Sequence, residues 1–326
     1  MKLERTRRFS IGFLILLLPL LSAEVSAQGG YAGAFLRLGV GARAKAVGDA
    51  HVALARGAEA SYYNPAGLPL LTQSEVLASY RALALDRQFT FVGLAIPISP
   101  KLESGRLAGG LALSWIRAGV NNIDGRDSDG RATGELSNSE NAFVLSFALN
   151  PMPAVSLGLS VKVLWNRFPG VGIDGATISA ASVGFDFGAM IRPVSWVSFG
   201  VSVRDVNSKY TWNTDKLYGE DGSEVINKFP TIFRYGLALR PPQIPRLLLL
   251  FDFEDSKQLD SRLHAGTEMT VAENLLLRAG YDDGSLTLGG GYAFGLLGKR
   301  SELNYAYVAS GNRPEEEHVF TWVFQF

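Results

Sequence analysis

The feature that most constrains the fold of this chain is an alternation of apolar and polar side chains that recurs along most of its length. Between residues 197 and 204, for example, valine and phenylalanine at odd positions alternate with serine, glycine and arginine at even positions. Successive side chains of a β-strand point to opposite faces, so each such segment predicts a strand with one apolar and one polar face. Fourteen segments of this kind begin near Glu75, Gln88, Leu107, Glu140, Val155, Thr177, Trp196, Phe229, Pro245, Ser261, Asn274, Ser285, Glu302 and Glu317.

A soluble β-sandwich also alternates, so the lengths of the segments and of their connections have to separate the two classes. The segments are about 9 to 14 residues long, close to the length of a tilted strand that crosses a bilayer. Connections after odd-numbered strands are mostly long and polar, as over residues 121–139, 168–176 and 207–228, whereas even-numbered connections are mostly short. This pattern predicts a fourteen-stranded antiparallel outer-membrane β-barrel, with long external loops and short periplasmic turns.

The first 27 residues have the organisation of a signal peptide. Basic residues precede an apolar run from Ile11 to Leu21, and Val25-Ser26-Ala27 offers a small-residue cleavage site. That run covers only about 16 Å as a helix, roughly half of a bilayer core. No later segment reaches the ~18 consecutive apolar residues of a transmembrane helix. We therefore expect export to the outer membrane, with a signal peptide over residues 1–27, a hatch over 28–73 and a barrel over 74–326.

The last predicted strand carries aromatic side chains on one face and ends at the C-terminal phenylalanine. In water such an edge would promote aggregation, whereas in lipid it is an ordinary outward face with an aromatic belt. The terminal residues Trp322, Phe324 and Phe326 also resemble the signal that outer-membrane assembly machinery reads. Outer-membrane lipid and this machinery are therefore the first partners that we expect.

The segment over residues 28–73 is rich in glycine and alanine and lacks sustained alternation. Residues 58–63 favour a short helix, ended by a turn at Asn64, Pro65, Ala66 and Gly67. Fourteen tilted strands close at a backbone radius of roughly 14 Å, which is too wide for the wall's own side chains to fill. We expect this segment to plug the barrel as a hatch, and a periplasmic tail is the alternative.

The run Phe35-Leu36-Arg37-Leu38-Gly39-Val40-Gly41-Ala42-Arg43-Ala44, followed by Gly48-Asp49-Ala50 and Ala60-Ser61-Tyr62-Tyr63-Asn64-Pro65-Ala66-Gly67-Leu68, resembles the N-terminal signature of the PorV/PorQ family. That family belongs to the wider FadL-like group of outer-membrane barrels. The segments Leu277–Tyr281, Gly289–Phe294 and Leu303–Tyr307 agree with it, so the resemblance covers nearly all of the chain after the signal peptide. It implies a fourteen-stranded barrel with an N-terminal hatch.

The resemblance implies two functions. FadL-like members pass hydrophobic compounds such as fatty acids or aromatics through a plugged barrel and sideways into the membrane. PorV-like members serve the type IX secretion system by binding cargo and docking on its translocon. We prefer the first, with displacement of the hatch around Asn64–Gly67 opening the route, because the predicted barrel is wide and its plug is rich in alanine and glycine. The modest external loops give little surface for a protein cargo, although the closest motif match is to the secretion branch. A purely structural outer-membrane protein is a third possibility.

Charged residues on the inward faces are the candidate lumen residues, and we expect them to pair with one another or with Arg37, Arg43, Lys45 and Asp49 of the hatch. The chain has 31 basic and 31 acidic residues, so it lacks the basic excess typical of a nucleic-acid-binding protein. The candidates are Lys162, Asp186, Arg204, Arg234, Asp252, His264, Glu268 and Arg278.

Catalytic, cofactor and metal motifs fail on their spacing. Cysteine is absent, which excludes thiolate sites. Gly39-Val40-Gly41 imitates a dinucleotide fingerprint but lacks the strand and helix that it needs, and the aspartates near Gly130 break EF-hand spacing. His264 and Glu268 lie four residues apart on one strand, roughly 13 Å, too far for an acid–base couple. We expect no cofactor, no metal and no enzymatic activity.

Overall fold

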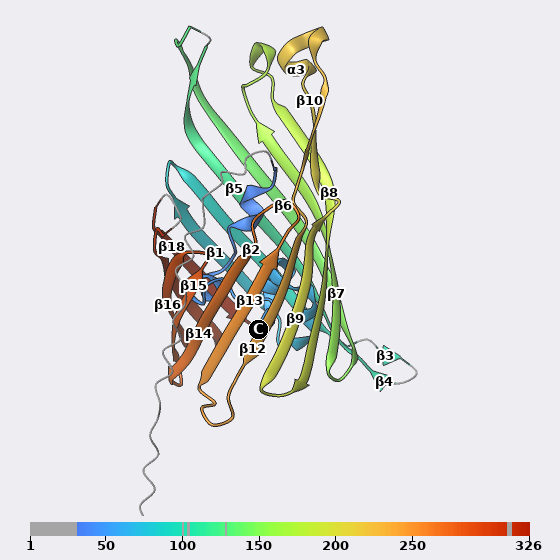
Figure 1. Ribbon diagram of the computed structural model, residues 1–326, viewed down its shortest axis with the longest axis vertical. Helices are drawn as coiled ribbons and strands as arrows, with labels where there is room; N and C mark the ends of the chain where they lie inside the picture. Colours follow the sequence, from blue (N-terminus) through green and yellow to red (C-terminus); the bar gives the residue numbers. More distant parts are fainter. Residues whose placement is uncertain (1–30, 100, 103–104, 128, 312–314) are drawn as a thin grey trace, which may run out of the picture.

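The computed structural model describes residues 31–326, apart from residues 100, 103–104, 128 and 312–314. The proposed signal peptide and residues 28–30 therefore lie outside the described residues. Fourteen antiparallel strands form one closed barrel (Figure 1). They are β1 (Glu75–Leu83), β2 (Arg87–Ile98), β5 (Ala108–Arg126), β6 (Ala132–Met152), β7 (Val155–Phe168), β8 (Ile178–Val194), β9 (Val197–Val206), β12 (Ile232–Leu239), β13 (Leu247–Asp255), β14 (Arg262–Ala272), β15 (Leu275–Asp282), β16 (Ser285–Leu296), β17 (Lys299–Val308) and β18 (Glu317–Gln325).

The barrel closes where its first and last strands pair, with Glu75 opposite Gln325 and Ala78 opposite Trp322. Inward and outward residues alternate as the sequence predicted: Phe199 of β9 is 48% exposed, whereas Ser202 is 1% exposed. An apolar outward face around a polar, filled interior is the arrangement of a membrane-spanning β-barrel. The predicted fold class, a fourteen-stranded barrel with a small N-terminal plug, is confirmed. Among the described residues, no helix combines the length and the apolar character needed to cross a bilayer.

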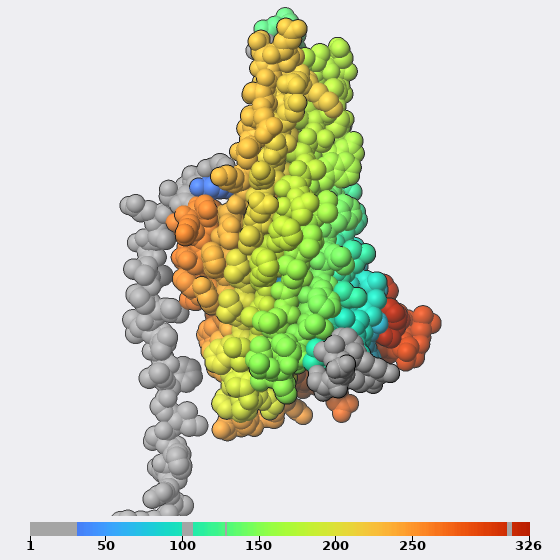
Figure 2. All heavy atoms as spheres, turned by 90° about the vertical axis from the view of Figure 1, so that its right-hand side faces the viewer, coloured from blue at the N-terminus to red at the C-terminus, as the bar shows by residue number. Residues whose placement is uncertain are grey.

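One side of the barrel wall rises well above the rest. Strands β5, β6 and β8 are the longest, and above β9 stand the two-stranded sheet of β10 (Lys209–Asn213) and β11 (Glu224–Lys228) and the short helices α3 (Asp215–Tyr218) and η5 (Gly219–Asp221). Figure 2 shows this tall wall as a column of green and yellow atoms. Smaller elements are β3 (Lys101–Leu102), β4 (Gly105–Arg106) and η4 (Ile173–Gly175).

In the tall wall, strands extend into segments that were predicted to be loops. The loop predicted over residues 121–139 is wrong, because β5 continues to Arg126 and β6 begins at Ala132, not near Glu140. Register shifts around Val120 and Gly125 interrupt the alternation there, which concealed the strand extensions in the sequence. The connection over residues 207–228 is likewise mostly structured. The other thirteen barrel strands begin within three residues of their predicted positions.

The segment before β1, called the hatch from here on, lies inside the barrel as the blue ribbon of Figure 1. It enters at the long-loop end, where the Ala32 amide donates to the Lys228 carbonyl at 3.1 Å, and leaves at the short-turn end, where the Phe326 amide donates to the Ser74 carbonyl at 2.9 Å. The chain thus runs through the lumen before it forms the wall. The hatch contains η1 (Ala34–Arg37), α1 (Ala42–Ala46), η2 (Gly57–Glu59), α2 (Ala60–Tyr63) and η3 (Pro65–Leu70).

Glycines on the inner face of the wall let the hatch backbone approach the strands directly. A Cβ atom on Gly266 of β14 would lie 2.6 Å from the Val47 carbonyl carbon, and one on Gly200 of β9 would lie 2.5 Å from the Val52 carbonyl oxygen. We call this set the glycine collar. It accounts for part of the high glycine content, 36 residues in 326. Its members are Gly93, Gly110, Gly158, Gly188, Gly200, Gly236, Gly266, Gly280 and Gly289.

Candidate functional site

Three charged side chains around hatch helix α1 reach the same side of the barrel. Arg43 pairs with Glu268 of β14 at 2.9 Å, and Lys45 pairs with Asp282 at the end of β15 at 2.6 Å. Asp49 pairs with Arg234 of β12 at 3.0 Å. All six side chains are mostly or fully buried, so each pair satisfies charges that would be costly to bury alone. The hatch is therefore fastened to strands β12–β15 by ion pairs.

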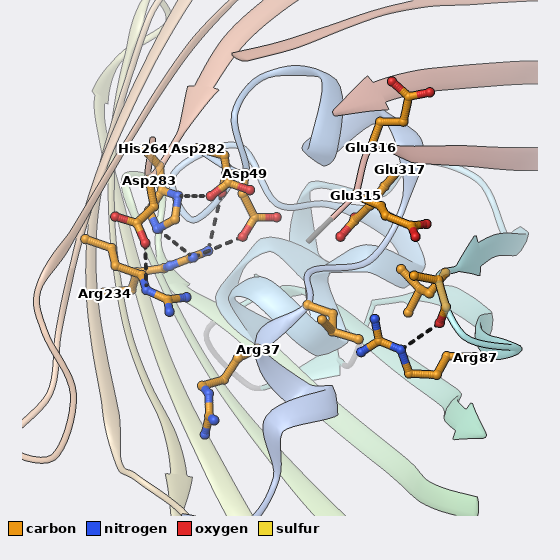
Figure 3. Close-up of a pocket in the computed structure, with 14 residues that line it drawn as sticks. Arg37, Asp49, Arg87, Arg234, His264, Asp282, Asp283, Glu315, Glu316 and Glu317 are labelled. Carbon is orange, nitrogen blue, oxygen red and sulfur yellow. Dashed lines mark hydrogen bonds and ion pairs between the residues drawn. The ribbon is translucent and has the colours of Figure 1, made fainter. Parts of the chain in front are cut away.

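Arg234 is the centre of this cluster, because it binds the carboxylates of Asp49 and, at 2.7 Å, Glu254. His264 lies 3.0 Å from Arg234 and from Asp282 (Figure 3). Burial by itself raises the pKa of Asp49, but the positive charges of Lys45 and Arg234 outweigh burial and hold that pKa well below its usual range. Asp49 is therefore ionised at neutral pH.

A second buried cluster lies on the opposite, taller side of the wall. Lys162 of β7 pairs with Asp186 of β8 at 2.7 Å and also binds Asp205 of β9. Sequence reasoning missed Asp205, because alternation places it outward. Its φ of 60° and the register shift beside Phe185 turn it into the lumen.

The remaining candidate lumen residues are also buried inside the barrel. Asp252 accepts the amides of His51 and Val52 at 2.8 and 2.9 Å, and Arg278 binds Glu268 at 2.7 Å. Arg204 donates to the Leu36 carbonyl and stacks over the ring of Tyr62, with 4.1 Å from Cζ to the ring centroid. Arg37, named as a hatch partner, donates instead to the Ala32 carbonyl and lines a cavity.

The Asn64–Gly67 turn holds the hatch together and fixes it to the wall. Asn64 caps η3, since its Oδ1 accepts the Ala66 amide at 3.1 Å. Its Nδ2 donates to the carbonyls of Val52 in the hatch and Ala189 in β8, at 3.0 and 3.1 Å. Pro65 occupies the first helical position, where its missing amide hydrogen costs nothing. This turn packs against the collar on β7 and β8, where no hatch charge takes part.

Two cavities open at the long-loop end, above the hatch. The first, of about 230 Å³, is charged: Arg234, His264 and Asp282 form one wall, and the acidic residues 315–317 stand across from them in Figure 3. The second, of about 210 Å³, lies between η1 and strands β2, β5 and β6. It is mostly apolar, and its apolar lining is Ala34, Phe35, Leu38, Leu83, Ala118 and Val120. Leu38, Leu83 and Arg87 line both cavities, so the two adjoin.

The apolar cavity was not predicted from the sequence. Its signal was present, because Ala118 and Val120 continue the inward face of β5, where most strands place polar residues. The arrangement suits binding of a small apolar molecule, and no group of residues within the described chain has the composition of a metal site. Trp322 and Phe326 lie on the outward face at the end of β18, 42% and 48% exposed, and Phe324 stacks beside Phe326.

No protein-family model and no curated protein sequence matches the chain. Solved structures do match. The toluene transporter TbuX of Ralstonia pickettii has a TM-score of 0.60 at 14% identity, covering 88% of this chain and 98% of that chain. The toluene transporter TodX of Pseudomonas putida has a TM-score of 0.57 at 15% identity, covering 88% and 97%. A FadL homologue of Pseudomonas aeruginosa has a TM-score of 0.55 at 13% identity, covering 85% and 95%. These likenesses establish the fold of a FadL-like barrel.

Proposed function

We propose that the protein is a non-enzymatic channel of the bacterial outer membrane that passes hydrophobic small molecules through its plugged lumen. The observation that carries this proposal is the apolar cavity at the long-loop end, which the hatch and the barrel wall line together. A molecule bound there touches Phe35 and Leu38 of the hatch, so its binding energy is available to move the hatch. The solved barrels of the same fold include proteins described as toluene transporters and monoaromatic hydrocarbon channels.

The route that we propose begins with displacement of the hatch near Asn64–Gly67. The collar packs against the hatch on both sides of the barrel, but the ion pairs lie on the β12–β15 side. On the β5–β8 side the hatch is held by this packing and by neutral hydrogen bonds such as that from Asn64 to the Ala189 carbonyl. Packing contacts are individually weak and non-directional, while the buried ion pairs resist separation. Displacement therefore begins on the β5–β8 side.

The experiment is uptake of radiolabelled toluene by bacterial cells that carry the full-length protein in the outer membrane. Ala118→Trp fills the apolar cavity and should lower the uptake rate about tenfold. A tenfold change corresponds to about 1.4 kcal/mol. Leu113→Trp is the matched control, because Leu113 is 58% exposed on the outward face of the same strand. Equal uptake by the two variants would overturn the proposal.

The PorV-like secretion function is a second candidate, supported by the sequence motifs between Phe35 and Leu68 and by the tall wall. The wall of β5–β8 with β10 and β11 projects beyond the rest of the barrel and offers a surface on which a protein partner could dock (Figure 2). A pull-down in mild detergent tests it. A stoichiometric large membrane partner favours secretion, whereas a bound apolar compound favours transport. If neither a partner nor an apolar compound is recovered, and the cells take up no toluene, a structural role is favoured.

A further inference from the structure

A third cavity, of about 290 Å³, opens at the short-turn end of the barrel. It lies between the hatch and the turns that join β8 to β9 and β12 to β13. Three arginines line it: Arg56 from the hatch, Arg192 from β8 and Arg240 from the β12–β13 turn. No acidic residue lines it. The charged cavity at the other end differs, because there acidic side chains stand opposite the arginines.

Two of the three arginines, Arg192 and Arg240, have no ion-pair partner among the described residues. Arg240 donates one hydrogen bond to the Pro245 carbonyl at 3.3 Å. Within the described residues, the guanidinium groups of Arg56 and Arg192 have no hydrogen-bond or ion-pair partner. The positive charge of Arg43 and burial lower the pKa of Arg56, and the carboxylates of Glu268, Glu75 and Glu302 partly offset this effect, so Arg56 is the least available of the three for an added anion. Like charges around one small cavity favour the binding of an anion between them.

Two further features of the cavity indicate the kind of ligand that fits it. Ser198 of β9 lines the cavity, and its buried Oγ lacks a hydrogen-bond partner among the described residues. An oxyanion accepts hydrogen bonds from a hydroxyl as well as from guanidinium groups. Part of the lining is apolar, since Leu54 and Leu70 of the hatch and Leu248 of β13 also contribute to it.

We infer that Arg192 and Arg240, with Arg56 beside them, form an anion-binding cup for a carboxylate or phosphate group attached to an apolar chain. The arginines bind the oxyanion, Ser198 donates to it, and the three leucines contact the chain. Two sources supply this chemistry: an amphiphile that leaves the lumen, or the headgroup of an anionic lipid in the adjacent leaflet. The inference does not depend on transport, because binding is measured on the isolated protein.

The experiment measures binding of octyl phosphate and octanoate to the purified full-length protein in a neutral detergent, with octanol as the uncharged probe. The double variant Arg192→Gln/Arg240→Gln should weaken binding of both anions by about tenfold or more, since each bond to an oxyanion is charge-assisted. Octanol binding should not change. The control Lys299→Gln/Arg300→Gln removes two exposed positive charges from the start of β17 at the same end, outside the cavity, and should retain full affinity.

Unchanged anion affinity in the arginine double variant would overturn the inference, and so would an equal loss in the control, which would indicate only bulk charge. Native mass spectrometry of protein extracted from membranes that contain phosphatidylglycerol separates the two sources. Co-purification of this lipid with the native chain, and its loss in the double variant, identifies a lipid headgroup as the ligand. If the double variant loses octyl phosphate binding and the native chain carries no co-purified lipid, the ligand is an amphiphile that leaves the lumen. Both results support the cup.

Discussion

Asp49 of the hatch and Arg234 of β12 form a buried ion pair, with 3.0 Å between Oδ2 and Nη2, although 185 residues separate them in the sequence. Asp49 also accepts the hydroxyl of Tyr63 at 2.6 Å. Burial and the negative charge of Asp49 raise the pKa of Tyr63 well above its usual value, so this hydroxyl remains a donor. One carboxylate thus joins two parts of the hatch to the barrel wall.

Replacing Asp49 with asparagine should loosen the hatch. Arg234 keeps Glu254 as a partner but loses one of its two carboxylates in a buried site, which should lower the free energy of unfolding by about 2–3 kcal/mol. The measurement is urea unfolding in detergent, followed by the heat-modifiable mobility of the barrel on gels. Asp129→Asn is the control, because the Asp129–Arg131 pair is exposed and should contribute less than about 1 kcal/mol. Equal stability of the two variants would show that the buried pair does not fasten the hatch.

The same pair predicts how hatch docking depends on pH. The folded-state pKa of Asp49 lies below its ordinary value of 3.8, so its stabilising contribution is complete above that value and disappears as the pH falls through the lower folded-state pKa. The stability difference between the native chain and Asp49→Asn should therefore be constant from pH 8 to pH 5 and shrink only in strong acid. Unfolding midpoints of both proteins across this range test the prediction. A difference that shrinks already between pH 7 and pH 5 would contradict it.

Adding one methyl group to the collar should displace the hatch. In Gly266→Ala the new Cβ would collide with the backbone carbonyl of Val47, which cannot move aside as a flexible side chain does. We expect a higher ion conductance in planar bilayers than the native protein shows. Gly290→Ala on β16 is the matched control, because its new Cβ would lie 3.2 Å from the Leu276 carbonyl oxygen and would not contact the hatch. If both variants conduct like the native chain, close approach at the collar does not seat the hatch.

Deleting residues 31–71 should raise conductance further, because the lumen of a fourteen-stranded barrel is too wide for its own side chains to fill. The planar-bilayer recordings used for the collar variants provide the comparison. A native protein that already conducts as strongly as the deletion variant would mean that the hatch does not obstruct the lumen.

Asn64→Asp should harm the hatch more than Asn64→Ala. Asparagine donates through Nδ2 to two backbone carbonyls, whereas aspartate would place a negative charge against the same two oxygens. Burial of that unpaired charge should cost about 1–3 kcal/mol beyond the loss of the hydrogen bonds. Thermal unfolding of both variants in detergent tests this order. A more stable Asn64→Asp would mean that the cap to the Ala66 amide, which aspartate preserves, dominates at this turn.

The strand pattern was predictable from the sequence because a half-buried wall requires strict alternation, and only one side of each strand meets lipid. At the far ends of β5 and β6 register shifts interrupt this alternation, and the predicted start of β6 was wrong by eight residues for that reason. The glycine collar could not be predicted from the sequence. A glycine that makes room for the hatch backbone cannot be distinguished there from a glycine in a turn. Asp205 was missed because a bulge reversed its direction. Pair geometry between hatch and wall depends on tertiary structure alone.

The path of the chain through its own lumen has a consequence for biogenesis. The hatch spans the lumen from Ala32 to Ser74 and then continues directly into β1, the strand that seals the cylinder against β18. A sealed cylinder whose inner backbone already touches the hatch on nine strands leaves no space for later threading. We therefore expect the sheet to wrap around an insert that is already in position. Joining the first strand to the last would then be the final step, with the insert as a template for the curvature of the sheet.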